Sequence, residues 1–92
     1  IYPRRAQERG IMGFAIVTFT ITETGTVENA KPLEGACGDP TNPDTVFRPC
    51  SIFNSAASRA SLKLKYKPKI VDGKAVRVDD VPHKFTFILE ED

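Results

Sequence analysis

Apolar and polar residues alternate most regularly between Gly13 and Thr22, where the sequence reads GFAIVTFTIT. Ala15, Val17 and Phe19 fall on one side of this segment, and the other side is mostly polar. A period of two, carried by β-branched and aromatic residues, is typical of a strand with one buried face. We therefore predict a strand here, with its odd-numbered residues facing the core.

A second strand is predicted to follow a tight turn. Residues 23–26 favour a hairpin, because Gly25 can adopt the positive φ that such turns need. The second strand then runs from Val27 to about Leu33. Pro32 has no N–H to donate to a neighbouring strand, so this strand is expected to lie at an edge or to be bulged near its end.

Two helices are expected, one before the first strand and one in the middle of the chain. Pro3 suits the first position of a helix and Gly10 the position just after one, so a short helix is predicted between them. The second helix starts after Ser51 as its N-cap and fades near Lys65, because Pro68 disfavours helical geometry in the residue before it. Its apolar stripe has helical spacing and comprises Phe53, Ala56, Ala57, Ala60 and Leu64.

The C-terminal part of the chain completes the pattern. Asp72-Gly73 is a turn signal between extended segments at 66–71 and 75–78. From His83 to Leu89, large apolar residues alternate with mostly polar ones, which predicts a half-buried strand. The order is short helix, strand, strand, helix, strand. We predict a single α+β domain over residues 1–92, with a small antiparallel sheet packed by helices.

The two cysteines flank a loop rich in Gly, Pro, Asn and Asp. Cys37 and Cys50 are expected to form a disulfide, which would indicate an oxidising compartment. Free thiols and a metal site are the alternatives. A zinc site would need about four ligands, and His83 is the only histidine in the chain.

Charge and motifs exclude several function classes. The chain carries 13 basic and 12 acidic residues, so no strong overall field favours nucleic acid, and the four alternate lysines from Lys63 to Lys69 are expected to be solvated. No apolar run reaches the roughly 18–20 residues that span a bilayer. No nucleophile elbow, phosphate loop or metal-ligand cluster accompanies His83. We predict no enzymatic activity, no cofactor and no metal.

Several short elements, taken in this order and spacing, resemble the TonB C-terminal domain family over nearly the whole chain. Each element alone is weak evidence for the family, but their order and spacing together are specific. They are Tyr2-Pro3 with Ala6-Gln7, Gly13 opening the strand VTFTI, Gly25 with Val27, the helical Phe53, Ala57 and Ala60, Tyr66-Lys67-Pro68, Val71-Asp72-Gly73 and the terminal FTFIL.

The resemblance implies an energy transducer of the periplasm. An inner-membrane anchor and a Pro-rich linker would precede Ile1, and the anchor would associate with the ExbB–ExbD motor. The domain would bind the TonB box of outer-membrane receptors that import siderophore iron, haem or cobalamin. A TolA-like envelope adaptor is the alternative, and a homodimer that exchanges its terminal strand is a further expectation for a free sheet edge.

The resemblance also places receptor binding on the last strand. Unpaired main-chain groups at a sheet edge can pair with an extended peptide. Gln7, from the opening motif, is the favoured side-chain contact because an amide both donates and accepts hydrogen bonds. A solvated helix residue is the alternative for Gln7. The predicted contact residues are Gln7, His83, Lys84, Phe85, Thr86, Phe87, Ile88 and Leu89.

Overall fold

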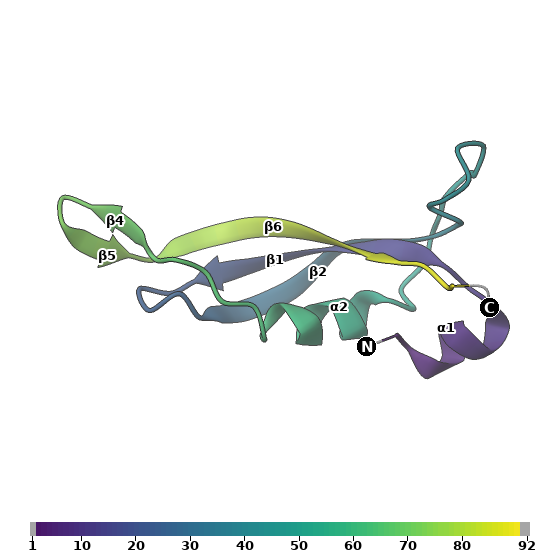
Figure 1. Ribbon diagram of the computed structural model, residues 1–92, viewed down its shortest axis with the longest axis horizontal. Helices are drawn as coiled ribbons and strands as arrows, with labels where there is room; N and C mark the ends of the chain where they lie inside the picture. The colour runs from purple at the N-terminus through teal and green to yellow at the C-terminus, as the bar shows by residue number, and fades with distance from the viewer. Residues whose placement is uncertain (1, 91–92) are drawn as a thin grey trace.

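The computed structural model describes residues 2–90 and has the predicted α+β architecture, an antiparallel sheet with a helix on one face and a second helix at one end (Figure 1). No helix in this part of the chain is long and apolar enough to cross a membrane. The elements are α1 (Arg4–Arg9), β1 (Gly13–Ile21), β2 (Val27–Cys37), β3 (Arg48–Pro49), α2 (Asn54–Ser61), β4 (Lys69–Val71), β5 (Lys74–Val76) and β6 (Val78–Phe87).

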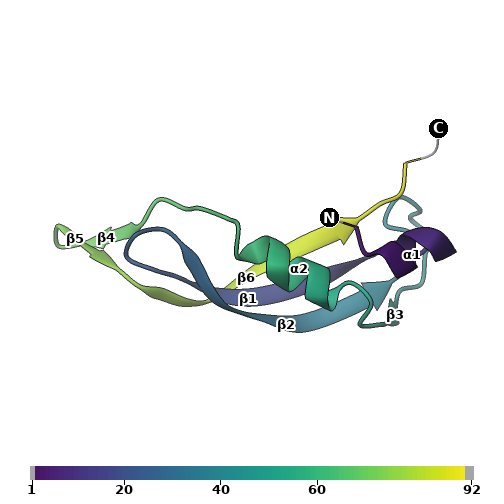
Figure 2. The ribbon, with the colours of Figure 1, turned by 90° about the horizontal axis from the view of Figure 1, so that it is seen from below.

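The main sheet has the strand order β3-β2-β1-β6, and its β1, β2 and β6 are long while β3 has only two residues. β1 lies in the centre and pairs antiparallel with β2 on one side and β6 on the other. Its odd-numbered residues from Gly13 to Phe19 are buried, and Ala15, Val17 and Phe19 share a core cluster with Phe53 and Ala57. α2 packs on β1 and β2 (Figure 2). The predicted strand and the direction of its buried face are therefore confirmed.

The core lies between β1 and α2. Val17, Phe19, Phe53 and Ala57 are essentially inaccessible to solvent. Gly13 lets the layers approach, since a Cβ there would collide with the Ala36 carbonyl and lie 2.8 Å from the Phe53 ring. A larger residue at this position would push the helix off the sheet.

The β1–β2 hairpin forms as predicted, and β2 is longer than expected. Gly25 has φ 84° in the turn, and any side chain there would meet the Tyr66 carbonyl. The register of β2 shifts between the partners of Ile16 and Val17, next to Pro32, so the predicted bulge is confirmed. Beyond the bulge the strand continues to Cys37, where β3 supplies a further partner.

The helix ends differ from the predicted ones. Gly10 ends α1 in the left-handed conformation, as expected, but Pro3 precedes the helix instead of opening it. Ser51 is not the N-cap of α2: its carbonyl accepts a turn hydrogen bond from the N–H of Asn54, and Phe53 is the residue before the helix. The helix ends at Ser61, before the predicted end near Lys65. The Ser61 hydroxyl donates a hydrogen bond to the Ala57 carbonyl at 2.9 Å, and such a side-chain bond competes with the main-chain hydrogen bonds of the helix.

The cysteine loop is closed by a disulfide. Cys37 and Cys50 are bonded, which confirms the favoured expectation over free thiols and metal ligands. The loop projects from the end of the sheet (Figure 1). Near its base Phe47 packs edge-on against Phe14, with ring centres 5.1 Å apart, so Phe14 is covered by the loop and lies on the sheet face opposite α2.

The Asp72-Gly73 turn forms a separate two-stranded hairpin from β4 and β5, which extends from the other end of the molecule (Figure 1). Both turn residues have positive φ, 52° and 79°, as in a type I′ turn. The last strand then starts at Val78, earlier than the predicted His83, and ends at Phe87. Ile88 and Leu89 therefore lie beyond the strand.

Candidate functional site

The outer edge of β6 is the longest regular sheet edge among residues 2–90. β6 pairs with β1 on one side and has no strand neighbour on the other within the described residues. The pairing is in register from Val81 to Phe87, after an irregularity between Phe19 and Ile21. The outer edge of this regular segment carries N–H and C=O groups that can pair with another strand.

The register shows which groups point outward. Pro82 lies opposite Thr18, and proline has no N–H to exchange, so this pair is of the non-hydrogen-bonded kind. Because hydrogen-bonded and non-hydrogen-bonded pairs alternate, the pairs of Lys84 and Thr86 are non-hydrogen-bonded as well. Their N–H and C=O groups therefore point away from β1.

A hydrogen bond elsewhere in the sheet independently indicates which main-chain groups of β6 point away from β1. The Gly35 carbonyl accepts from the Cys50 N–H at 3.0 Å, so Gly35 points away from its β1 partner, Ala15. Ala15 must then bond on its other side, to Phe85 of β6. This again leaves the main-chain groups of Thr86, the next residue, directed outward.

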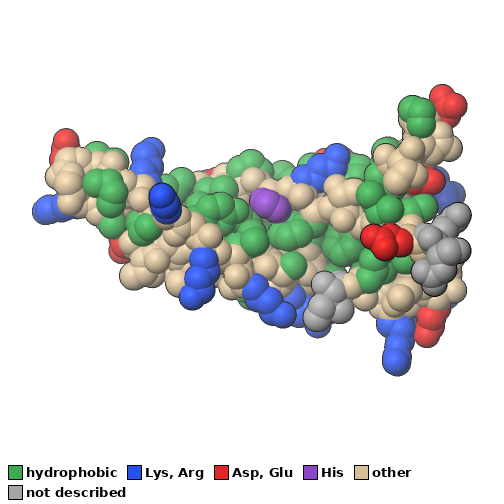
Figure 3. All heavy atoms as spheres, in the orientation of Figure 1, with side chains coloured by type: hydrophobic (Ala, Val, Ile, Leu, Met, Phe, Trp, Pro, Cys, Tyr) green, Lys and Arg blue, Asp and Glu red, His purple; other side chains and the backbone are tan. Residues whose placement is uncertain are grey.

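The side chains of β6 differ between its two faces. On the face that carries α2, His83 and Phe85 are half-buried, with ring centres 4.5 Å apart. Phe87 stacks on Phe53 at 4.5 Å. Figure 3 shows the histidine within a band of apolar side chains. On the opposite face, the Lys84 ammonium lies 4.3 Å from the centre of the Phe14 ring.

The start of the chain meets the end of β6. The Tyr2 ring packs edge-on against Phe87 at 5.7 Å and against Phe53 at 5.8 Å. Its hydroxyl donates to the Ile11 carbonyl, and burial raises the pKa of the tyrosine. Gln7 lies exposed on α1, the helix that follows Tyr2. The structure thus gathers residues 83–87 on the free strand, with α1 close to its end.

Family and structural comparisons agree with this architecture. The family described as "Gram-negative bacterial TonB protein C-terminal" matches residues 1–89. The chain belongs to the TonB C-terminal family. It is 33% identical over 76 residues to the protein TonB of Pseudomonas aeruginosa, a match that covers 83% of this chain and 19% of that protein.

A solved structure is also similar. The TonB2 protein of Vibrio anguillarum superposes with a TM-score of 0.62 at 32% identity, over 99% of this chain and 74% of the other. The resemblance and the fold class predicted from the sequence are confirmed.

The opposite side of this TonB-family sheet is a poorer edge. β3 covers only Ala36 and Cys37 of β2. Further along, β2 is interrupted by register shifts and by Pro32. Bulges and proline hinder the pairing of another strand, so β6 offers the longer regular template.

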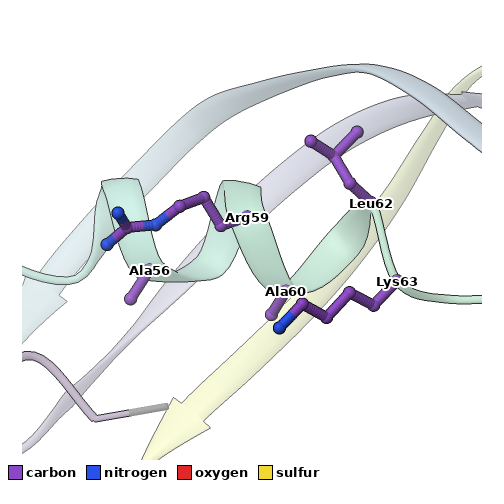
Figure 4. Close-up of a pocket in the computed structure, with 5 residues that line it drawn as sticks. All are labelled: Ala56, Arg59, Ala60, Leu62 and Lys63. Atoms are coloured by element: carbon purple, nitrogen blue, oxygen red, sulfur yellow. The ribbon is translucent and has the colours of Figure 1, made fainter.

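Sequence reasoning missed a groove along α2. It has a volume of about 660 Å³ and is lined by alanines between two exposed basic side chains (Figure 4). The sequence did contain a sign of this groove in two pairs of residues spaced four apart. This spacing places Ala56 next to Ala60, and Arg59 next to Lys63, on the surface of a helix. The helical spacing alone predicts that these alanines face the sheet. The lining residues are Ala56, Arg59, Ala60, Leu62 and Lys63.

Proposed function

We propose that this domain is the periplasmic part of a TonB-type energy transducer and that it binds the TonB box of outer-membrane receptors by strand addition to β6. The free and regular edge of β6 carries the proposal. An extended peptide can bond to the outward groups of Lys84 and Thr86 and to the Pro82 carbonyl. Because these are main-chain bonds, receptors with different TonB-box sequences can share one site.

Strand addition also suits the transmission of force. Each main-chain hydrogen bond contributes only about 0.5–1.5 kcal/mol net, so binding stays reversible. Several such bonds pulled along the strand would share the load. Tyr2 packs against Phe87, so a pull that enters through the start of the domain would reach the end of the binding strand through one aromatic contact.

The rest of the transducer is part of the proposal. The chain spans 19% of the length of the Pseudomonas aeruginosa relative. In the full-length protein, an inner-membrane anchor would couple the domain to the ExbB–ExbD motor of a Gram-negative bacterium. The bound receptors would import iron–siderophore complexes, haem or cobalamin. Gln7, exposed on α1, would contact the receptor peptide near the end of β6.

A proline substitution tests the binding edge. Thr86→Pro removes one outward N–H, and Pro82 already occupies an equivalent outward position four residues earlier, so the domain should fold normally. We expect affinity for a synthetic TonB-box peptide to fall about fivefold to tenfold. The variant loses the main-chain hydrogen bond from residue 86 to the peptide, and the adjacent hydrogen bonds are less well aligned. Calorimetric titration measures the affinity, and circular dichroism checks the fold.

Thr86→Ala is the matched control, because it changes the same side chain and keeps the N–H. It should bind like the unaltered domain. If the proline and alanine variants both fold and bind equally well, the peptide does not pair with this edge. If the unaltered domain binds no TonB-box peptide at all, an adaptor of the TolA kind explains the fold better.

A further inference from the structure

The α2 groove opens on the side of the helix that faces the end of β6. At one end of α2, Phe53 stacks on Phe87 of β6 at 4.5 Å. Beyond the other end, Tyr66 and His83 both pack on Phe19, at 6.0 and 6.3 Å. α2 itself packs on β1 and β2, and these two contacts connect the segments that flank it to the β6 side of the sheet. In Figure 4, Ala56, Ala60 and Lys63 point to the side of α2 where the end of β6 emerges.

The groove is open because its floor is made of small side chains. Ala56 is 8% exposed and Ala60 is partly exposed, and neither reaches out to fill the space beside the helix. Leu62 adds an apolar edge that is 52% exposed. The groove can therefore accept side chains from a neighbouring strand without moving the helix.

The rim of the groove is basic. Arg59 and Lys63 are exposed at its border, and Figure 3 shows basic side chains beside the apolar band on this face of the molecule. The acidic residues of β6, Asp79 and Asp80, lie at the start of the strand, beyond His83. Asp79 is already bonded to Thr20 and Arg77. The charged residues that line the groove are thus both basic, which suits an acidic partner.

A strand added to β6 would be adjacent to this groove. It would lie about 4.8 Å further out, with alternate side chains on the face that carries α2. These side chains would rise toward the alanine floor, and a long one would reach the basic rim. A shift of the peptide by one residue would turn these side chains to the other face, so the groove would also fix the register.

We infer that the groove is a specificity subsite, in which Arg59 and Lys63 bind a glutamate of the peptide that pairs with β6. This inference rests on the proposed strand addition and adds a chemical preference to it. Apolar neighbours of the glutamate on the same face of the peptide would contact Ala56 and Ala60. The occupant is an extended peptide with one acidic residue among alternate apolar residues.

Two synthetic peptides and one double variant test the subsite. The first peptide has about eight residues of alternating Val and Thr with one Glu in place of a central Val, and the second has Gln at that position. The unaltered domain should bind the Glu peptide about threefold to tenfold more tightly, as expected for two exposed ion pairs. The preference should vanish in R59Q/K63Q and at about 0.5 M salt, where exposed charges are screened.

The control variant is K69Q/K74Q, which makes the same charge change on the β4–β5 hairpin and should keep the preference. Basic residues in the last turn of a helix also stabilise it through its dipole, so the melting temperature of each variant is measured as well. Equal binding of both peptides to the unaltered domain would overturn the subsite and leave strand addition in place. So would a preference that persists in R59Q/K63Q. Binding of neither peptide would overturn strand addition and the subsite together.

Discussion

Asp79 links the start of β6 to the rest of the sheet through its carboxylate. Oδ1 accepts a hydrogen bond from the Thr20 hydroxyl at 2.8 Å and another from Arg77 Nε at 3.2 Å. The Thr20 bond is the main reason that the pKa of Asp79 lies below its usual value, with a smaller contribution from Arg77. Arg77 in turn bonds Glu28 of β2 at 2.6 Å, so these side chains tie β6, β1 and β2 together.

The lowered pKa of Asp79 makes stability depend on pH. A carboxyl group whose folded pKa is depressed contributes stability above its unfolded pKa, near 4, and loses it as the pH falls through the folded value. Asp79→Asn keeps an oxygen that can accept from Thr20 but cannot titrate. We expect the variant to lose less stability than the unaltered domain between about pH 6 and pH 2. Urea unfolding followed by circular dichroism measures the difference.

Asp72→Asn serves as the control. Asp72 sits in the β4–β5 turn at φ 52°, a conformation that Asn adopts readily. This variant should lose stability on acidification as the unaltered domain does. If Asp79→Asn shows the same acid loss as the control, the hydrogen bonds to Thr20 and Arg77 do not favour the ionised carboxylate.

Single residues with a local role were predictable from the sequence. Gly10 and Gly25 adopt positive φ because a helix end and a hairpin turn require it within a few residues. Arg59 was not predictable in the same way. Its position matters through the groove along α2, and the side of the helix that stays open is set only when α2 packs on β1 and β2 in the folded chain.

At the scale of elements, the sequence predicted which segments form strands better than where the strands end. β6 begins at Val78 because an irregularity in its pairing takes up Asp80 at φ 56°, and Pro82 faces outward where no N–H is needed. Asp and Pro together favour a turn when only neighbouring residues are considered. Their place in the strand depends on β1, which lies far away in the sequence.

The cysteine loop is the element most dependent on a covalent bond. The disulfide joins residues separated by 13 positions and closes a loop that contacts the sheet through Phe47. Reduction should lower the free energy of unfolding by about 2–4 kcal/mol, because the unfolded chain regains the freedom of the open loop. Thermal melting with and without a phosphine reductant measures the change.

A C37S/C50S variant provides the control for this measurement. It should melt near the temperature of the reduced domain and be insensitive to the reductant. Equal melting temperatures for the oxidised and reduced domain would show that the loop is held by its packing on the sheet and not by the disulfide.

The whole molecule is elongated, with principal extents of 48 × 24 × 22 Å. The β4–β5 hairpin lies at one end, and α1 and the cysteine loop lie at the other (Figure 1). β6 runs along the long axis between them, with its outer edge free of any strand among residues 2–90. This shape suits a domain that is pulled along its length while it holds a peptide parallel to that axis.

Backbone amide exchange in β6, with and without a saturating TonB-box peptide, is the most direct test of strand addition. The amides of Lys84 and Thr86 point outward and should exchange quickly in the free domain, whereas those of His83 and Phe85 are bonded to β1. Peptide binding should slow Lys84 and Thr86 markedly and leave His83 and Phe85 almost unchanged. If the peptide binds and the Lys84 and Thr86 amides still exchange at their free rates, it docks elsewhere and the central claim is wrong.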